Sequence, residues 1–343
     1  LIAGHPHYRF RMADYGFGSD RLELRMTAIR HGGELSRIQV RYPEAPKPWL
    51  DLSTGLNPRP WPWQDNVSPN DIMAATTYLP NQNGFNFCHD AWTGYLKTGT
   101  PDEWTLAAGS QAVINLLPNL FPDYGVCLPD PTYGEHVRVW QKAGRPVSRI
   151  DATELFQRPF PARQVLIVTN PNNPDGHLFD PDDLIALAAR LRDQDSFLIV
   201  DEAFCDVLPE QSLAGRTLPS NIVLLRSLGK FFGLAGLRIG MFRAAGALRE
   251  EMRDMLGPWQ VNGPALLIAG HALRDESWIV QTRQRLKQDG DRLRDILSQA
   301  GLQISGSTDL FCLTRSEEAA EIAETLARNG IYVRSFVEDD QYL

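Results

Sequence analysis

QVLIVTN (residues 164–170) is a near-continuous run of apolar, mostly β-branched residues that ends in polar ones. Such a run is typical of a strand that is buried on both faces of a parallel sheet. A helical pattern follows at 180–194, with Asp180 as the expected N-cap and Pro181 at the first helical position. A second apolar strand comes next, SFLIVDEAF (196–204). This strand–helix–strand order predicts a parallel sheet covered by helices.

The same alternation continues on both sides of this stretch. Further strands are expected at 125–129, 146–150, 221–227 and 237–244, and further helices at 110–121 and 134–144. After about residue 245 the pattern changes to amphipathic helices at 247–256 and 278–301, then a strand at 309–315, a helix at 316–330 and a strand at 331–336. The predicted fold class is therefore α/β, with a mostly parallel central sheet, helices on both faces, and a smaller α+β domain.

The chain divides into four expected segments. Residues 1–25 lack helical or strand periodicity and precede Met26, so we interpret them as a disordered or upstream extension. An N-terminal arm follows at 26–74, and its Pro- and Trp-rich part at 42–64 is expected to be extended. Residues 75–255 form the large domain and 256–343 the small domain.

Composition excludes several classes of protein. The chain has 343 residues, 22% of them charged, and a net charge of −8, which argues against a nucleic-acid or anionic-membrane surface. Its apolar runs fall short of the ~20 residues that span a bilayer, and the N-terminus lacks the apolar core of a signal peptide. Four cysteines show no paired spacing, which favours reduced thiols without a disulfide or metal site: Cys88, Cys127, Cys205 and Cys312. We therefore expect a cytoplasmic protein.

Four polar clusters stand where strands end or helices begin: AGSQ (108–111), TNPNNPDG (169–176), DEAF (201–204) and SLGK (227–230). In an open parallel sheet, ligands bind at the carboxyl ends of the strands. The four clusters are therefore expected to meet at one edge of the sheet and to form one site.

Each cluster taken alone has a structural and a chemical interpretation. Asp201 either caps a turn or pairs with a cationic nitrogen, and Asn173 belongs to a plain Asn/Pro turn or presents an amide to a ligand oxygen. Ser110 is either an N-cap or, with the helix N-terminus, part of a phosphate site. Lys230 either lays its stem along apolar surface or acts as a nucleophilic amine.

Together the clusters favour the chemical interpretation. Gln111 follows Ser110 at the helix start, Ser227 and Arg238 flank the lysine, and Tyr133 follows a turn at another strand end. A lysine amine, an acid for a ring nitrogen, a phosphate site and an aromatic face are what pyridoxal 5′-phosphate requires of a protein. The sequence therefore predicts a site for this cofactor.

The order GSQ, PTY, NPNNPDG, DEAF, SLGKFFGLAGLRIG resembles the fold-type I pyridoxal-phosphate enzymes of the aminotransferase class I/II superfamily, across roughly residues 75–343. The resemblance implies that Lys230 forms the Schiff base and that Asp201 pairs with the pyridinium nitrogen. It further implies cofactor contacts from Asn173, Tyr133, Ser110, Gln111, Ser227 and Arg238. Tyr78 would reach the phosphate of the neighbouring subunit in a homodimer. Phe204 departs from the tyrosine that many aminotransferases carry there.

Two motifs in the N-terminal arm narrow the resemblance to one family within this superfamily. RHGGEL (30–35) and LDLSTGLNPRPWP (50–62) resemble the L-threonine-O-3-phosphate decarboxylases of cobalamin biosynthesis, although Glu34, Thr54 and Leu56 differ from that family's pattern. The resemblance implies that the arm binds the phosphate of a small phosphorylated amino acid through His31, Gly32, Gly33 and Asn57. Arg334 is the candidate for the substrate carboxylate, and related enzymes carry another arginine beyond the position of Leu343.

The implied reaction is decarboxylation of L-threonine O-3-phosphate to (R)-1-amino-2-propanol O-2-phosphate and CO₂. The bond that breaks at Cα is the one held perpendicular to the cofactor ring, so substrate orientation selects the reaction. Two alternatives remain open at this point. One is a histidinol-phosphate aminotransferase or a related amino-acid aminotransferase, and the other is a non-catalytic binding or regulatory protein with the same fold.

Overall fold

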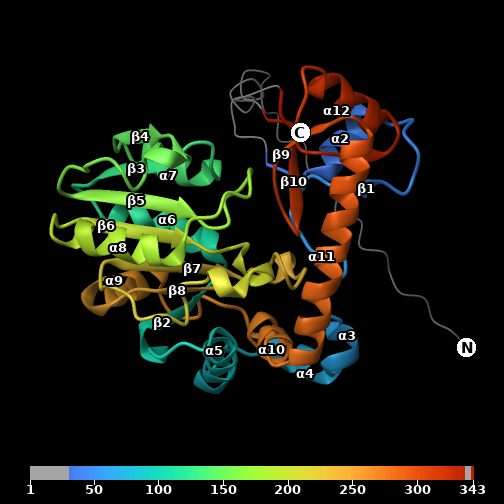
Figure 1. Cartoon of the computed structure of the whole chain (residues 1–343). Helices are drawn as coiled ribbons and strands as arrows, with labels where there is room; N and C mark the ends of the chain where they lie inside the picture. Colours follow the sequence, from blue (N-terminus) through green and yellow to red (C-terminus); the bar gives the residue numbers. More distant parts are fainter. Residues whose placement is uncertain (1–30, 337–340) are drawn as a thin grey trace, which may run out of the picture.

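The structure is a computed structural model, and it describes residues 31–336 and 341–343 (Figure 1). The segment interpreted as an extension, 1–25, lies outside the described residues. Within the described part of the chain, the helices are all too short or too polar to cross a lipid bilayer.

A seven-stranded sheet forms the centre of the large domain. Its strand order is β2-β8-β7-β6-β5-β3-β4, and only β8 runs antiparallel to its neighbours. The strands are β2 (Trp104–Ala107), β3 (Gly125–Pro129), β4 (Val147–Ile150), β5 (Gln164–Thr169), β6 (Phe197–Asp201), β7 (Ile222–Ser227) and β8 (Gly240–Arg243). The predicted α/β class with a mostly parallel sheet is confirmed.

The apolar run in β5 explains why this sheet is buried on both faces. Val165 and Ile167 belong to one hydrophobic cluster, whereas Leu166 and Val168 belong to the other. Successive side chains of a strand point to opposite faces, so an uninterrupted apolar run contributes to both cores. Helices on both faces complete the two cores: α6 (Ser110–Leu120), α7 (Gly134–Lys142), α8 (Pro181–Arg192), α9 (Gly246–Leu256), α5 (Gln82–Leu96) and α10 (Gly263–Ala272).

The expected start of α8 is confirmed in atomic detail. The side chain of Asp180 accepts hydrogen bonds from the backbone N–H groups of Asp182 at 2.8 Å and Asp183 at 3.3 Å. Pro181 occupies the first turn, where its missing N–H leaves no intrahelical bond unmade.

The helix α11 (Glu276–Gln299) connects the seven-stranded sheet and its covering helices to the part of the structure around β9 (Gln303–Thr308) and β10 (Phe311–Arg315), which is called the small domain from here on. Figure 1 shows it running from α10 and the short helices α3 (Trp63–Asn66) and α4 (Pro69–Thr77) to the small domain. There it packs on the antiparallel pair β9 and β10. The helices α12 (Ala319–Arg328) and α2 (Leu35–Arg41) lie at the same end.

Three expectations about strands and extended chain differ from the structure. The strand expected at 331–336 is reduced to β11 (Ile331–Tyr332), because it pairs only with the two-residue strand β1 (Leu50–Asp51) of the arm. The strand β9 was not expected, since its sequence QISGST lacks an apolar run and its burial comes from pairing with β10. The arm segment 42–64 was expected to be extended, but it contains a turn in which the backbone N–H of Ala45 donates to the carbonyl O of Tyr42 at 3.2 Å, and α3 begins at Trp63.

Gly240 brings β8 against the start of α6. A Cβ atom at this position would lie 2.7 Å from the backbone N of Ser110 and 2.7 Å from the carbonyl O of Arg226. Both neighbours are backbone atoms, so neither can move aside without displacing a strand or a helix.

We expect Gly240→Ala to lower the free energy of unfolding by about 1–3 kcal/mol, as overpacking of a core does. Gly236→Ala is the matched control, because a Cβ there would meet nothing within 4 Å. It should change the free energy of unfolding by less than about 0.5 kcal/mol. Urea unfolding monitored by circular dichroism measures both, and equal stability of the two variants would contradict the close packing of β8 on α6.

Candidate functional site

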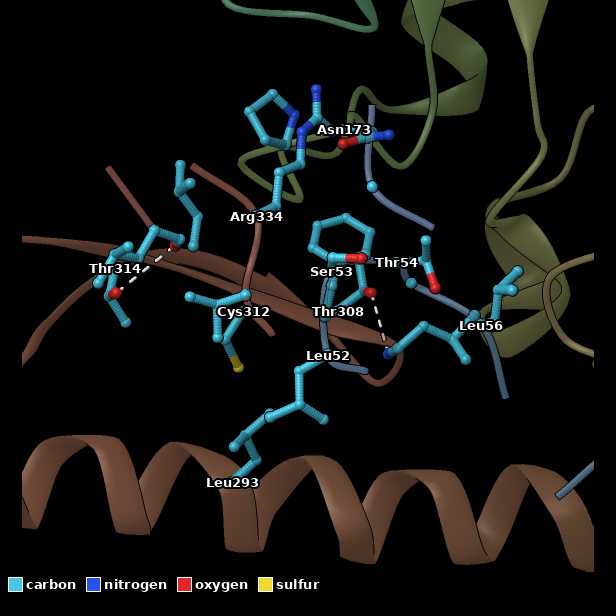
Figure 2. Close-up of a pocket in the computed structure, with 18 of the residues that line it drawn as sticks. Leu52, Ser53, Thr54, Leu56, Asn173, Leu293, Thr308, Cys312, Thr314 and Arg334 are labelled. Atoms are coloured by element: carbon cyan, nitrogen blue, oxygen red, sulfur yellow. Dashed lines mark hydrogen bonds between the residues drawn. The ribbon is translucent and has the colours of Figure 1, made fainter. Parts of the chain in front are cut away.

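A cavity of about 470 Å³ opens at the carboxyl ends of β5 and β6, beside the loop that follows β7, and its opposite walls come from the arm and the small domain. Figure 2 shows Arg334 on the same side of this pocket as Asn173, with Leu52 and Leu293 of α11 at the other end. Lys230, Tyr133 and Phe204 also line it. Three of the four clusters expected to meet at this edge, TNPNNPDG, DEAF and SLGK, therefore contribute residues to the pocket lining, whereas AGSQ does not.

Lys230 presents an amine that the pocket shields from water. Its Nζ lies 5.2 Å from the ring centroid of Phe204. Burial lowers the pKa of Lys230 below its ordinary value; the charge of Asp201 opposes this shift, and Arg238 adds to it. A lowered pKa increases the fraction of unprotonated amine, which is the nucleophilic form.

Asp201 ends β6 as an almost fully buried carboxylate with fixed partners. Its Oδ2 lies 3.0 Å from Nε2 of the buried His136, and its Oδ1 accepts a hydrogen bond from the backbone N–H of Ala203 at 3.0 Å. His136 is a site residue that the sequence analysis missed. Its position three residues after Tyr133, one turn along α7, was the available signal.

The start of α6 is a helix N-terminus whose free N–H groups lie beside Arg238. Gly109 holds the N-cap position with φ +80°, and within the described chain no side chain caps the free N–H groups of this helix. The interpretation of Ser110 as a plain N-cap is therefore wrong. A Cβ on Gly109 would lie 2.8 Å from Nη2 of Arg238, so the guanidinium covers the glycine. Ser227 lies opposite Gly240 in the sheet register, next to this helix start. Free N–H groups, a hydroxyl and a guanidinium are the donors that bind phosphate.

The side chain of Gln111 supports the wall of the pocket. The Tyr133 hydroxyl donates to Gln111 Oε1 at 3.1 Å, and Gln111 Nε2 donates to Glu135 Oε2 at 3.1 Å. Burial, with the nearby carboxylates of Glu135 and Asp201, raises the pKa of Tyr133 to about 12. The phenol therefore stays protonated at neutral pH and keeps donating to Gln111.

Glu135 joins the arm to this wall and was also missed by the sequence analysis. His31 Nε2 lies 2.9 Å from Glu135 Oε1, and Arg138 binds the same carboxylate at 2.6 and 2.5 Å. Burial raises the pKa of Glu135, but the hydrogen bonds from Arg138 and His31 outweigh burial and hold the pKa below its ordinary value. The His31 ring lies 6.1 Å from that of Tyr133, so the arm reaches the site.

The two glycines after His31 let the arm touch the segment after β1. A Cβ on Gly32 would lie 1.8 Å from the carbonyl O of Ser53, so only glycine fits there. The Gly33 N–H donates to Ser53 Oγ at 2.8 Å. We expected this N–H to be open to an anion, whereas the structure uses it to hold the arm.

Asn57 was expected to contact substrate, but its amide is engaged within the protein. Its neighbours Leu56 and Pro58 line the pocket, whereas Asn57 itself is buried at 3% exposure, with Nδ2 donating to the carbonyl of Phe231 at 2.8 Å. Its Oδ1 accepts from the backbone N–H of Arg59 and from Nη2 of Arg285. Asn57 therefore fixes the loop that carries Lys230.

Tyr78 does not join the pocket within one chain. It follows α4 and is 73% exposed, which leaves it available to a second copy of the chain. The four cysteines are free thiols, and over the described residues no group of His, Cys, Asp and Glu side chains is arranged to hold a metal ion.

Comparison with known proteins identifies the family. The family model described as aminotransferase class I and II matches residues 78–339. The chain belongs to the aminotransferase class I and II family. Members use pyridoxal phosphate. The residues present fit it: the uncapped start of α6 under Arg238 suits a phosphate, and Asp201 suits a cationic ring nitrogen.

Among relatives, the threonine-phosphate decarboxylase of Pseudomonas aeruginosa is 37% identical over 310 residues, which cover 90% of each chain. The histidinol-phosphate aminotransferase 1 of Legionella pneumophila is 29% identical and covers 68% of this chain and 69% of its own. The structure of L-threonine-O-3-phosphate decarboxylase from Porphyromonas gingivalis aligns with a TM-score of 0.71 at 18% identity, over 84% of this chain and 91% of its own. At that identity it shows the fold alone.

The lowered pKa of Lys230 predicts a pH-dependent stability of the cofactor-free protein. Below the folded pKa, protonating the buried amine destabilises the native state, and this penalty vanishes as pH rises toward the unfolded value of 10.5. We therefore expect Lys230→Met to be more stable than wild type at pH 7, with a gain that shrinks as the pH rises toward 10.5. Urea unfolding across this range measures it. Lys142→Met at the exposed end of α7 is the control. If the difference in unfolding free energy between Lys230→Met and wild type were the same at every pH, it would contradict the lowered pKa of Lys230.

Proposed function

We propose that this protein is a pyridoxal-phosphate-dependent decarboxylase of L-threonine O-3-phosphate that forms (R)-1-amino-2-propanol O-2-phosphate and CO₂ for cobalamin biosynthesis. The observation that carries the proposal is the extent of the likeness. Similarity to the Pseudomonas aeruginosa decarboxylase covers 90% of this chain, so the aligned region must include the arm segment 50–62. Similarity to the Legionella pneumophila aminotransferase covers 68%.

The protein's own residues divide the work between cofactor and substrate. Lys230 carries the cofactor, and Asp201, oriented by His136, keeps a proton on the ring nitrogen. When bound, pyridoxal phosphate supplies a ring that accepts the electron pair released at Cα. Arg334 orients the substrate carboxylate. The arm binds the substrate phosphate through His31, whose ring lies beside that of Tyr133.

Decarboxylation requires the carboxylate to stand perpendicular to the ring, whereas transamination requires the Cα–H bond to stand there. The residues at the sheet edge suit either reaction, so in this proposal the arm and Arg334 decide which of the two reactions occurs.

The four-part domain division and the cytoplasmic location remain predictions.

Purified protein with pyridoxal phosphate should release CO₂ and an aminopropanol phosphate in equal amounts from L-threonine O-3-phosphate. Lys230→Ala should lower kcat by roughly 10³-fold or more. Arg334→Gln should lower kcat/KM by about 10- to 100-fold, because a charged hydrogen bond to the carboxylate is lost. Arg328→Gln, on the exposed face of α12, is the matched control and should change neither.

Amino transfer to 2-oxoglutarate without CO₂ release would contradict the proposal in favour of the aminotransferase. Failure of the protein to bind the cofactor, seen as no visible absorbance band, would favour a non-catalytic protein of this fold.

We further propose that the protein is a homodimer in which Tyr78 reaches the partner's cofactor phosphate. Three exposed residues at and after α4 support an interface there: Met73 at 67%, Tyr78 at 73% and Leu79 at 67% exposure. Apolar side chains this exposed in one patch are typical of a contact surface.

Sedimentation should therefore give twice the chain mass of 38.5 kDa. Tyr78→Phe should weaken cofactor affinity by about 10-fold, the value of a hydrogen bond to a charged group. Tyr124→Phe is the control, because its hydroxyl binds Asp195 at the opposite edge of the sheet. A monomer, or an unchanged affinity in Tyr78→Phe, would contradict the proposed interface.

A further inference from the structure

The loop after Lys230 is held from two sides, by the arm and by α11. From the arm, the backbone N–H of Asn57 donates to the carbonyl O of Lys230 at 3.0 Å, and that of Trp61 donates to Phe232 O at 2.9 Å. The contact is close: a Cβ on Gly233 would lie 2.7 Å from the carbonyl O of Asn57. The backbone of the catalytic lysine therefore cannot shift without moving the arm.

The helix α11 holds the same loop through side chains. The Trp278 ring stacks on Phe232 with centroids 5.6 Å apart and meets Phe231 edge-on at 5.7 Å. Asp275, the N-cap of α11, accepts from Trp61 Nε1 at 3.0 Å. The first half of α11 is thus attached to both the lysine loop and the arm.

The second half of α11 is attached to the small domain. A Cβ on Gly290 would lie 3.2 Å from the Cα of Asp309, and Arg294 Nη2 lies 3.4 Å from the Asp309 carboxylate. Asp309 precedes β10, whose residues line the pocket. One continuous helix therefore joins the lysine loop to the wall of the pocket that the small domain supplies.

The side chain of Asn57 forms hydrogen bonds with the lysine loop, with α11 and with the arm. Its Nδ2 binds the carbonyl of Phe231, and its Oδ1 accepts from Arg285 of α11 at 3.1 Å and from the backbone of Arg59. Both lone pairs of the amide oxygen are used, and the side chain is buried. A contact with substrate through this oxygen would require one of these bonds to break.

We propose that Asn57 is a positioning residue that, together with Arg285, ties the backbone of Lys230 to α11, so that the position of the small domain sets the position of the catalytic amine. Asn57 then acts through Lys230 and does not touch the substrate. The proposal concerns the protein's own contacts and holds for any substrate of the site.

A double-mutant cycle with Asn57→Ala and Arg285→Met tests the link. Hydrogen–deuterium exchange of peptide 228–234 in the cofactor-free protein reports the loop directly. We expect each single variant to speed this exchange by at least about fivefold and the double variant to add little, as coupled neighbours do. Arg292→Met, an exposed arginine on the same helix, is the control and should leave the exchange unchanged.

The loaded enzyme supplies a second readout. In both single variants the pH midpoint of the visible cofactor band should shift, and kcat should fall by about 5- to 50-fold while KM for the substrate changes less than about twofold. Arg285→Lys keeps a hydrogen-bond donor on α11, so it should restore part of the kcat and part of the pH midpoint. If Asn57→Ala fails to fold, Arg285→Met and Arg285→Lys carry the test.

A contrary pattern would overturn the proposal. It consists of a large rise in KM for Asn57→Ala alone, no effect of Arg285→Met on exchange or on the pH midpoint, and additive effects in the double variant. That pattern would assign Asn57 to substrate binding.

Discussion

The buried carboxylate of Asp201 is the constraint on which the site depends. It lies at 2% exposure at the end of a strand that has neighbours on both sides, and an unpaired charge in such a place would be very costly. His136 and the Ala203 N–H satisfy it, which requires α7 to start where it does and the chain to turn sharply after β6. In the proposed function, the negative charge of this carboxylate also pairs with the cationic ring nitrogen of the cofactor.

The opposite side of the same strand ends carries a second buried charge cluster. Arg226 binds both Glu202 and Asp206, and Ser212 donates to Glu202 at 2.6 Å. Burial alone would lower the pKa of Arg226, but the two carboxylates raise it, so the guanidinium stays charged. Glu202 adjoins Asp201 in β6 and Arg226 adjoins Ser227 in β7. This ionic cluster therefore connects the ends of β6 and β7, the strand ends that carry Asp201 and Ser227.

The parts of this arrangement that the sequence predicts are those with a local cause. The apolar run of β5 marks a strand buried on both faces, and the parallel-sheet rule brings Asn173, Asp201 and Lys230 to one edge. The functions of His136, Glu135 and Asn57 depend on contacts with residues 65, 104 and 174 positions away in the chain, so a local signal such as the spacing of His136 from Tyr133 does not by itself reveal them. Strand β9 escaped prediction for the same reason, since only its partner β10 makes it a strand.

Chemistry and selectivity are thus carried by different parts of the chain. The sheet edge holds Lys230 and Asp201 in a geometry that suits several reactions at Cα. The arm and the small domain supply His31 and Arg334 to the pocket lining, and in the proposed function these two residues bind the substrate's phosphate and carboxylate. Glu135 gives His31 a negative partner at 2.9 Å. In the proposed function, a substrate phosphate that binds His31 must compete with this carboxylate or share the imidazole with it. A doubly charged phosphate competes better than an uncharged side chain, which favours an amino-acid phosphate over an uncharged amino acid.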